Sequence, residues 1–289
     1  MKIRERSRLA DALIYAVLAL SGILTVVPML HVFSVSLTAS AAVYDAPILL
    51  YPRQLTLRAF DYIFTTPSLI RAFGVTVQIT LLGTLLNLLF TITAAYALSK
   101  RYLPGLRAFM LLIVVVMTFN AGIIPTYLNV KQFGLLDSIW AMIVPGTVNA
   151  FYLILMRNFF MDLPAEIEES ARMDGCSEPV LIARIVVPLS MPVIATVGLF
   201  YGVAHWNEFF KGVFYITDTR KWPLQVLLKT ILFDNNFNEL KSSDNIAMRI
   251  EPANVQAAVI VFATVPIMLV YPFLQKYFVK GIVMGAVKG

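Results

Sequence analysis

The side chains that could take part in chemistry are concentrated in one polar stretch, residues 162–188. It reads Asp-Leu-Pro-Ala-Glu-Ile-Glu-Glu-Ser-Ala-Arg-Met-Asp-Gly-Cys-Ser-Glu-Pro and continues through Val180-Leu-Ile-Ala-Arg-Ile-Val-Val to Pro188. The sequence has neither an H-E-x-x-H nor a G-x-S-x-G pattern, and His31 and His205 lack metal-ligand spacing. We therefore predict no catalytic centre and no metal site.

The first half of this stretch has the signals of a short helix. Asp162 and Pro164, with the early acids Glu166 and Glu168, predict a capped start, because an oxygen acceptor, a preset φ and negative charge all suit the free N–H groups there. Gly175 is the matching stop. Ser177-Glu-Pro179 then predicts a second start, with the helix ended at Pro188. The local prediction is a helix, a glycine turn and another helix.

The composition around this stretch is that of a membrane protein. Of the 289 residues, 59% are hydrophobic and 14% are charged, against roughly 25% charged in soluble domains. The mean hydropathy is +0.78. The single cysteine, Cys176, excludes an internal disulfide, and its place in the polar stretch indicates a reduced cytoplasmic setting.

Six stretches are apolar enough to span a bilayer, which needs about 20 residues. The first, Leu9 to Leu37, follows a basic N-terminus, and Ala39-Ser-Ala41 resembles a signal cleavage site. An h-region has roughly 7–15 residues, so we expect this longer run to be a retained helix. The predicted membrane domain covers 9–279, between short cytoplasmic ends at 1–8 and 280–289. The other five spans are expected at about 72–98, 106–130, 139–160, 189–210 and 254–279.

The basic residues predict the orientation of these spans. With both termini in the cytoplasm, nearly all of the net charge of +6 falls on the cytoplasmic side, as the positive-inside tendency requires. The basic balance is then a topological signal, and nucleic-acid binding is not expected. Residues 38–70 and 211–252 become outer loops, and residues 161–188 become a cytoplasmic loop between the fourth and fifth spans.

A cytoplasmic hairpin between two spans is well placed to receive energy from outside the chain. The sequence has no G-x-x-x-x-G-K-[ST] phosphate loop, so ATP is not expected to bind here by that route. A helix-turn-helix joined to two spans could lie in a groove of an ATPase subunit and convert its closure into rotation of the spans.

The order of residues in this hairpin resembles the EAA loop of permease subunits of bacterial ABC importers. Small or apolar replacements stand at Ser170, Cys176, Ile182 and Val187. The positions that agree with the family pattern are Glu169, Ala171, Asp174, Gly175, Ile185 and Pro188. The resemblance implies that Glu169 and its neighbours dock on the ATPase. The coupling residues it implies are Glu169, Ser170, Ala171, Arg172, Asp174, Gly175, Ile185 and Pro188.

Further motifs extend the resemblance from about residue 10 to the C-terminus. They are Asn120-Ala-Gly-Ile-Ile-Pro-Thr-Tyr-Leu, Gly134-Leu-Leu-Asp-Ser-Ile-Trp, Met156-Arg-Asn-Phe-Phe, Trp206-Asn-Glu-Phe-Phe and Trp222-Pro-Leu-Gln-Val-Leu-Leu. The chain is similar to maltose-type carbohydrate importer permeases, in the branch that handles oligosaccharides and polysaccharide fragments. Within this branch the chain most resembles the alginate-type importers, although fragments of an uncharged sugar polymer would fit these residues equally well as substrates.

This resemblance implies an all-α, six-span permease of the type I ABC importer fold in a bacterial inner membrane. It implies a second permease, two ATPase subunits that hold ATP and Mg²⁺, and an extracytoplasmic solute-binding protein. No cofactor is expected in this chain. A gradient-driven secondary transporter or channel is the alternative, but such proteins place ion-handling acids at the midplane, and we find no convincing one. An intramembrane enzyme is disfavoured by the missing motifs.

Polar and aromatic side chains on the spans are the candidates for sugar contact, because such groups are costly in a membrane unless they face a cavity or a partner. For each, hydrogen bonding between helices or anchoring at the interface is the more common role. We expect Glu208 to snorkel or cap, and Gly198 and Gly202 to allow close helix packing. The candidates are Asn120, Asn149, Tyr152, His205, Trp206, Asn207, Glu208, Asn254 and Gln256.

Overall fold

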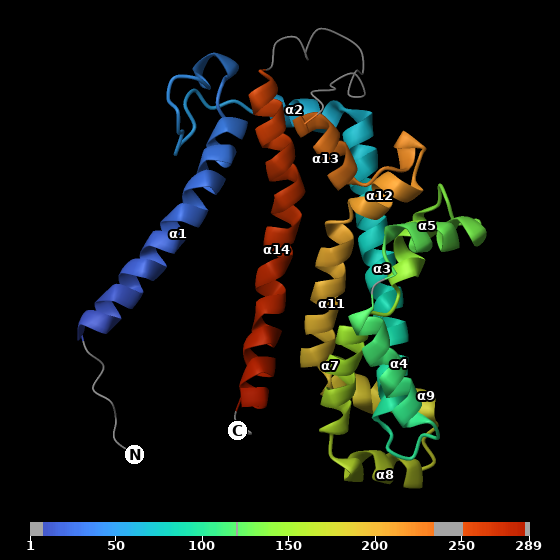
Figure 1. Cartoon of the computed structure of the whole chain (residues 1–289). Coiled ribbons are helices and arrows are strands. Elements are labelled where there is room, and N and C mark those ends of the chain that lie inside the picture. Colours follow the sequence, from blue (N-terminus) through green and yellow to red (C-terminus); the bar gives the residue numbers. More distant parts are fainter. Residues whose placement is uncertain (1–7, 120, 234–250, 287–289) are drawn as a thin grey trace. The chain divides into compact units, whose positions relative to one another are not determined.

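The computed structural model describes residues 8–119, 121–233 and 251–286. Every named element in these ranges is a helix, and the single extended pairing among them is the isolated bridge between Thr38 and Leu55. The all-α prediction is therefore confirmed (Figure 1). The described residues form two compact units, one within 8–70, 228–233 and 251–265 and the other within 71–119, 121–227 and 266–286.

The first unit contains α1 (Arg8–Ser36), the short α2 (Arg58–Thr65) and the beginning of α14 (Pro252–Ala286). The loop between α1 and α2 folds back on α1, where the His31 Nδ1 atom accepts a hydrogen bond of 3.0 Å from the Leu49 backbone. A small apolar core of Val35, Val43, Leu49 and Ala257 fastens this loop between α1 and α14. The loop predicted at 38–70 is thus an ordered structure that includes a helix.

The second unit is built on α3 (Pro67–Ser99) and α11 (Met191–Trp206). These helices approach closely because glycines face the contact. A Cβ on Gly83 would lie 2.5 Å from the His205 ring, and one on Gly198 would lie 3.2 Å from Leu88. Gly202 lies against Thr84 in the same way. The packing role predicted for Gly198 and Gly202 is confirmed.

Three of the six predicted spans are single long helices. The helices that are long and apolar enough are Asp11–Ser36, Pro67–Ser99 and Pro252–Val270. They correspond to the first, second and sixth predicted spans. The count reaches six only when three pairs of bent helices are each taken as one span.

Two of the other three predicted spans, 106–130 and 139–160, are broken, so their continuity was wrongly predicted; the third bent pair breaks at the start of the predicted span 189–210, within which α11 is continuous. The pairs are α4 (Leu106–Thr118) with α5 (Ile123–Gln132), Ile139–Gly146 with α7 (Ala150–Met161), and Glu178–Leu189 with α11. The second pair bends by 52° and the third by 88°. Local chemistry explains the breaks, because Gly122 has φ +81° and Asn149 caps a new helix. The predicted span 189–210 also ends early, since α11 stops at Trp206.

The predicted outer loop 211–252 is partly helical where the structure describes it. It contains most of α12 (Phe210–Tyr215), a 3₁₀ turn at Thr219–Lys221 and α13 (Leu224–Phe233). Asp137 stabilises the first part of this predicted loop, because its carboxylate accepts hydrogen bonds from the Thr217 backbone N–H and hydroxyl, both at 2.6 Å. The rest of the predicted loop, 234–250, lies outside the described residues.

Candidate coupling site

The polar stretch folds into the predicted helix, glycine turn and helix. The first helix is α8 (Ala165–Met173), with Glu166 and Glu168 in its first turn. The predicted cap at Asp162 is wrong, because Asp162 closes the preceding helix α7 through its backbone N–H, and Pro164 occupies the N-cap position without a side-chain hydrogen bond. α7 runs into the loop with only two residues between it and Pro164, so Asp162 belongs to its end. The early acids still suit the free N–H groups of α8.

Gly175 ends α8 as predicted. Its φ of +78° lies in the left-handed region that favours glycine. The Cys176 N–H donates to the Ala171 carbonyl at 3.0 Å, and the Gly175 N–H donates to the Arg172 carbonyl at 3.0 Å. This is the paired hydrogen-bond pattern of a Schellman motif. A Cβ on Gly175 would meet nothing within 4 Å, so the backbone angle alone demands glycine.

The second helix begins as predicted but does not end at Pro188. It starts with α9 (Glu178–Leu181), widens into a π-helical turn at Ile182–Val186 and continues as α10 (Val187–Leu189). A proline in a regular helix clashes with the carbonyl four residues earlier. A π-helical turn just before it changes that spacing, so the chain stays helical past Pro188 and turns at Ser190.

One face of the hairpin packs on the second unit's spans. Ala171, Leu181 and Val186 are buried in a cluster with Met156 and Phe160 of α7. Figure 1 shows α8 lying crosswise at the end of α7. Because these contacts are apolar and buried, the hairpin is fixed to the membrane helices as a packed element and is not a free loop.

A compact ionic network secures the hairpin to the end of α3. Glu168 forms ion pairs with Lys100 and, at 3.3 Å, with Arg172. Arg172 also pairs with Glu178 at 2.8 Å. The Tyr96 hydroxyl donates to Glu178 at 2.9 Å and accepts from Arg172 at 3.2 Å, while the Lys100 ammonium lies 4.1 Å from the Tyr96 ring centroid. Two cations therefore balance two carboxylates around one phenol.

Burial makes part of this network sensitive to the loss of a partner. The side chains of Lys100 and Glu168 are only 14% and 12% exposed. Removing one member of a buried pair leaves the other charge without compensation, which costs several kcal/mol. The hydrogen bond to Glu178 raises the pKa of Arg172, so its guanidinium stays charged.

The family-implied coupling residues divide between two faces of the hairpin. Ala171 is buried, Arg172 lies in the ionic network and Ile185 packs against the apolar cluster. The exposed residues of this set are Glu169, Ser170, Asp174, Gly175 and Pro188. Met173, beside them, is 88% exposed. The hairpin thus has one face fixed to the spans and another that no described residue of this chain covers.

Sequence reasoning missed Tyr96, Lys100 and Glu178 as members of the network. One signal could have suggested part of the cluster, because Glu168 and Arg172 are spaced by four residues on α8, whereas Lys100 lies one residue beyond the end of α3. The contact between Tyr96 and Glu168 joins positions 72 apart in sequence, and no local pattern indicates it.

The candidates for sugar contact on α7 and α11 hold each other in place. Asn149 caps α7 by accepting from the Phe151 and Tyr152 N–H groups at 2.9 and 3.2 Å. Tyr152 packs edge-to-face on Tyr201, with ring centroids 4.9 Å apart. His205 is buried and lies 3.0 Å from the Asn87 amide nitrogen. Their role in sugar contact stays a prediction.

The remaining candidates also have partners within the chain. Trp206 packs against Phe73, Asn207 donates to the Val203 carbonyl and Gln256 donates to the Ile231 carbonyl. Glu208 accepts from the Lys211 N–H in the first turn of α12 at 3.1 Å and pairs with the Lys211 ammonium at 2.9 Å. Asn254 donates to two carbonyls at the end of α1 and just beyond it. Asn120 lies outside the described residues.

The described helices include several that are long and apolar enough to cross a membrane. Residues 52–284 match the model of the family described as "Binding-protein-dependent transport system inner membrane component". The chain belongs to this family. It is therefore a permease subunit of an ABC transport system, and neither a gradient-driven transporter nor an enzyme.

Individual relatives are similar over nearly the whole chain. LplC of Bacillus subtilis (strain 168) is 45% identical, over 93% of this chain and 91% of its own length. The polygalacturonan/rhamnogalacturonan transport system permease protein YtcP of the same organism is 41% identical, over 98% and 100%. A chain of a solved bacterial ABC transporter involved in the import of the acidic polysaccharide alginate is 32% identical, over 96% and 100%, with a TM-score of 0.86.

Proposed function

We propose that this permease imports oligosaccharides cut from plant or microbial polysaccharides, with acidic fragments as the preferred class. The observation that carries the proposal is the 41% identity to the polygalacturonan/rhamnogalacturonan permease along 98% of this chain. The likeness to the chain of the alginate importer supports it, because both relatives are named for acidic polymers.

The transporter that this subunit serves contains, in our proposal, a second permease, two ATPase subunits and a solute-binding protein. ATP and Mg²⁺ bind in the ATPase subunits. The family name supports the solute-binding protein. The chain sits in the bacterial inner membrane with both termini in the cytoplasm, which the distribution of basic residues supports.

The two faces of the hairpin suggest how movement of an ATPase subunit is coupled to movement of the spans. The exposed face around Glu169 and Asp174 docks on an ATPase subunit, and the buried face passes the movement of that subunit to the spans. The apolar cluster carries it to α7, and the network of Tyr96, Lys100 and Glu168 carries it to α3. A packed element with a buried ionic attachment moves with its neighbours as a rigid body.

ATP hydrolysis by the complete transporter in proteoliposomes tests the substrate class. The solute-binding protein would be loaded in turn with galacturonate oligosaccharides, with alginate oligosaccharides or with neutral glucose oligosaccharides of equal length. We expect the acidic chains to stimulate hydrolysis and uptake together. Stimulation by the neutral chains alone would contradict the proposed class, and stimulation by none of them would contradict oligosaccharide import.

A further inference from the structure

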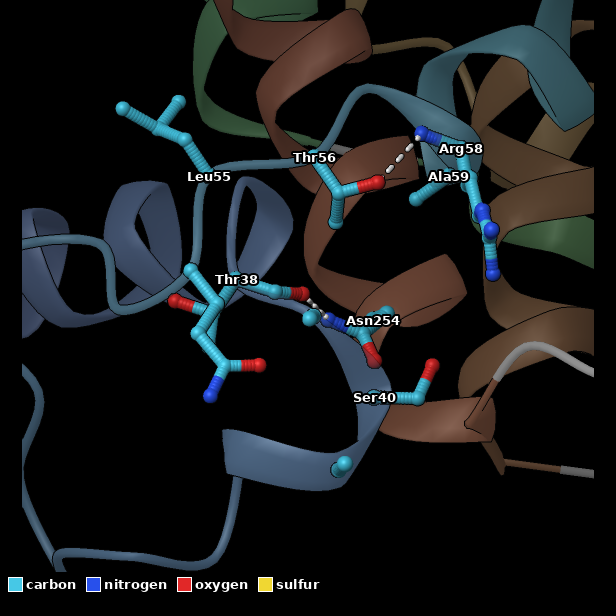
Figure 2. Close-up of a pocket in the computed structure, with 10 residues that line it drawn as sticks. Thr38, Ser40, Leu55, Thr56, Arg58, Ala59 and Asn254 are labelled. Carbon is cyan, nitrogen blue, oxygen red and sulfur yellow. Dashed lines mark hydrogen bonds between the residues drawn. The ribbon is translucent and has the colours of Figure 1, made fainter.

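The first unit contains a cavity of about 560 Å³ that is remote in sequence from the coupling hairpin. It forms where the loop after α1 and the start of α2 meet the start of α14 (Figure 2). Its volume lies in the range of small-ligand sites, about 300–1,000 Å³. The cavity is lined by Thr38, Ala39, Ser40, Ala41, Gln54, Leu55, Thr56, Arg58, Ala59 and Asn254.

Hydrogen bonds inside the unit hold the walls of this cavity in shape. The Thr38 hydroxyl donates to the Ser34 carbonyl at 2.6 Å and accepts from the Arg53 N–H at 3.2 Å. The Ala39 N–H donates to the Gln54 carbonyl at 3.1 Å. Gln54 itself has φ +49°, an unusual angle for a residue other than glycine. Backbone strain of this kind persists where the surroundings enforce it, so the cavity is preformed.

Asn254 presents an unused hydrogen-bond acceptor at the cavity wall. The residue is only 2% exposed, and its amide nitrogen donates to the Val35 and Thr38 carbonyls at 2.7 and 2.8 Å. Its Oδ1 atom is buried and has no hydrogen-bond partner among the described residues. Figure 2 shows this oxygen turned toward Ser40, away from Thr38. A buried acceptor of this kind calls for a donor, and a ligand hydroxyl is a suitable one.

Arg58 supplies positive charge to the same cavity. It is the first residue of α2, and its backbone N–H bonds the Thr56 hydroxyl at 3.3 Å. The side chain is exposed. Among the described residues, no ion pair is formed by its guanidinium. An arginine left free in this way can bind a carboxylate through two parallel hydrogen bonds.

The cavity therefore combines a cation, a neutral acceptor and hydroxyl and amide groups beside the apolar side chain of Ala59, while Figure 2 shows the Leu55 side chain pointing away from Asn254. We propose that it binds a hydroxylated carboxylate, namely one uronic-acid residue of an acidic oligosaccharide. The carboxylate pairs with Arg58, a ring hydroxyl donates to Asn254 Oδ1, and a C–H face lies on the apolar side. A neutral sugar would leave Arg58 unpaired, and a phosphate dianion would offer no donor to Asn254.

This proposal rests on the proposed function for the source of the ligand, and binding of a sugar acid to the purified transporter tests it. The complete transporter in detergent, without ATP and without the solute-binding protein, is titrated by calorimetry with a galacturonate trisaccharide and with its methyl ester. Arg58→Gln should weaken binding of the acid at least about tenfold, as expected for loss of a charged hydrogen-bond pair. The methyl ester should bind wild type and variant equally weakly.

Arg53→Gln is the matched control, because Arg53 is a nearby exposed arginine that pairs with Asp45 at 3.8 Å and does not line the cavity. It should bind the acid as wild type does. Arg58→Lys keeps the charge and should retain part of the affinity. Equal binding of acid and ester, or unchanged binding in Arg58→Gln, would overturn the cavity assignment.

A parallel ATPase assay separates this failure from failure of the proposed function. If the loaded solute-binding protein stimulates hydrolysis while acid binding is unaffected by Arg58→Gln, the cavity proposal falls and oligosaccharide import stands. If Arg58-dependent binding of the acid is present, the cavity is supported whatever the ATPase assay shows. Elution of each variant as an intact complex shows that its loss of binding is not loss of folding.

Discussion

Tyr96 is the residue on which the attachment of the coupling hairpin depends most. Its hydroxyl contacts both carboxylates and the guanidinium of the network, and its ring lies under the Lys100 ammonium. The same ring packs edge-to-face on Phe160 of α7. One side chain thus links α3, α7 and both halves of the hairpin.

Tyr96→Phe should weaken this link while keeping the ring packing. Loss of the hydroxyl removes bonds to charged groups worth about 1.5–3 kcal/mol. We expect the variant to assemble with its ATPase subunits but to show several-fold less substrate-stimulated ATP hydrolysis, with basal hydrolysis retained. Tyr102→Phe, at an exposed residue just after α3, is the control. Equal stimulation in Tyr96→Phe and wild type would show that the hydroxyl has no part in coupling.

Asp137 gives the segment that begins at Thr217 a predictable dependence on pH. Hydrogen bonds from Thr217, and from the Asp218 backbone, lower the pKa of Asp137 below its ordinary value. A lowered folded-state pKa means that the stabilisation is complete above the ordinary value of about 3.9. It is lost as the pH falls through the folded-state pKa. Asp218, whose pKa Arg220 lowers, titrates in the same acid range.

Hydrogen exchange of residues 211–222 measures this effect. We expect protection to be constant from pH 7 to pH 5 and to fall below about pH 4. Asp137→Asn should be less protected already at pH 7, and any remaining acid transition should then belong to Asp218. Protection in Asp137→Asn that matched wild type at pH 7 would refute the role of this carboxylate as a brace.

At the scale of elements, the contact between α3 and α11 depends on small residues at specific turns. Gly83→Ala should disrupt it, because a Cβ there would lie 2.5 Å from a buried histidine ring. Overpacking of this kind costs about 1–3 kcal/mol. Gly74→Ala in the same helix meets nothing within 4 Å and should be neutral or stabilising, since alanine favours helix. Thermal unfolding in detergent would distinguish the two, and equal melting temperatures would contradict the contact.

The sequence predicted those elements whose signals are local. The glycine turn of the hairpin and the helix α3 were predicted because glycine at positive φ and a long apolar run each act within a few turns. The breaks in the two spans predicted at 106–130 and 139–160 were not, because hydropathy over about 20 residues averages across a single Gly122 or Asn149. Pro188 was predicted to end the second helix, but the helix continues to Leu189 after a π-helical turn at Ile182–Val186.

The candidate site was predictable in part for the same reason. The exposed hairpin residues belong to one continuous stretch and follow a family pattern. The attachment of that stretch to Tyr96 and Lys100 joins distant segments, and the cavity at Arg58 and Asn254 joins residues almost 200 positions apart. Composition and local spacing do not predict contacts between residues that are distant in sequence, so these contacts are seen only in the folded chain.

At the scale of the whole molecule, we propose that the hairpin converts closure of the ATPase subunits into movement of the spans. Gly175 tests it most directly, because this glycine forms the turn between the two hairpin helices and a Cβ added there would meet none of the described residues within 4 Å. Valine is poorly tolerated at φ +78°, whereas asparagine enters this region readily. The two variants thus differ in backbone strain at one exposed position.

The decisive measurement is substrate-stimulated ATP hydrolysis and uptake by the reconstituted transporter carrying Gly175→Val, Gly175→Asn or the wild-type permease. Each complex is first shown to retain its ATPase subunits and second permease. We predict that Gly175→Val loses most of the stimulation and uptake, while Gly175→Asn keeps most of both. Normal stimulation and uptake in Gly175→Val would contradict the account, because the hairpin would then not be the coupling element.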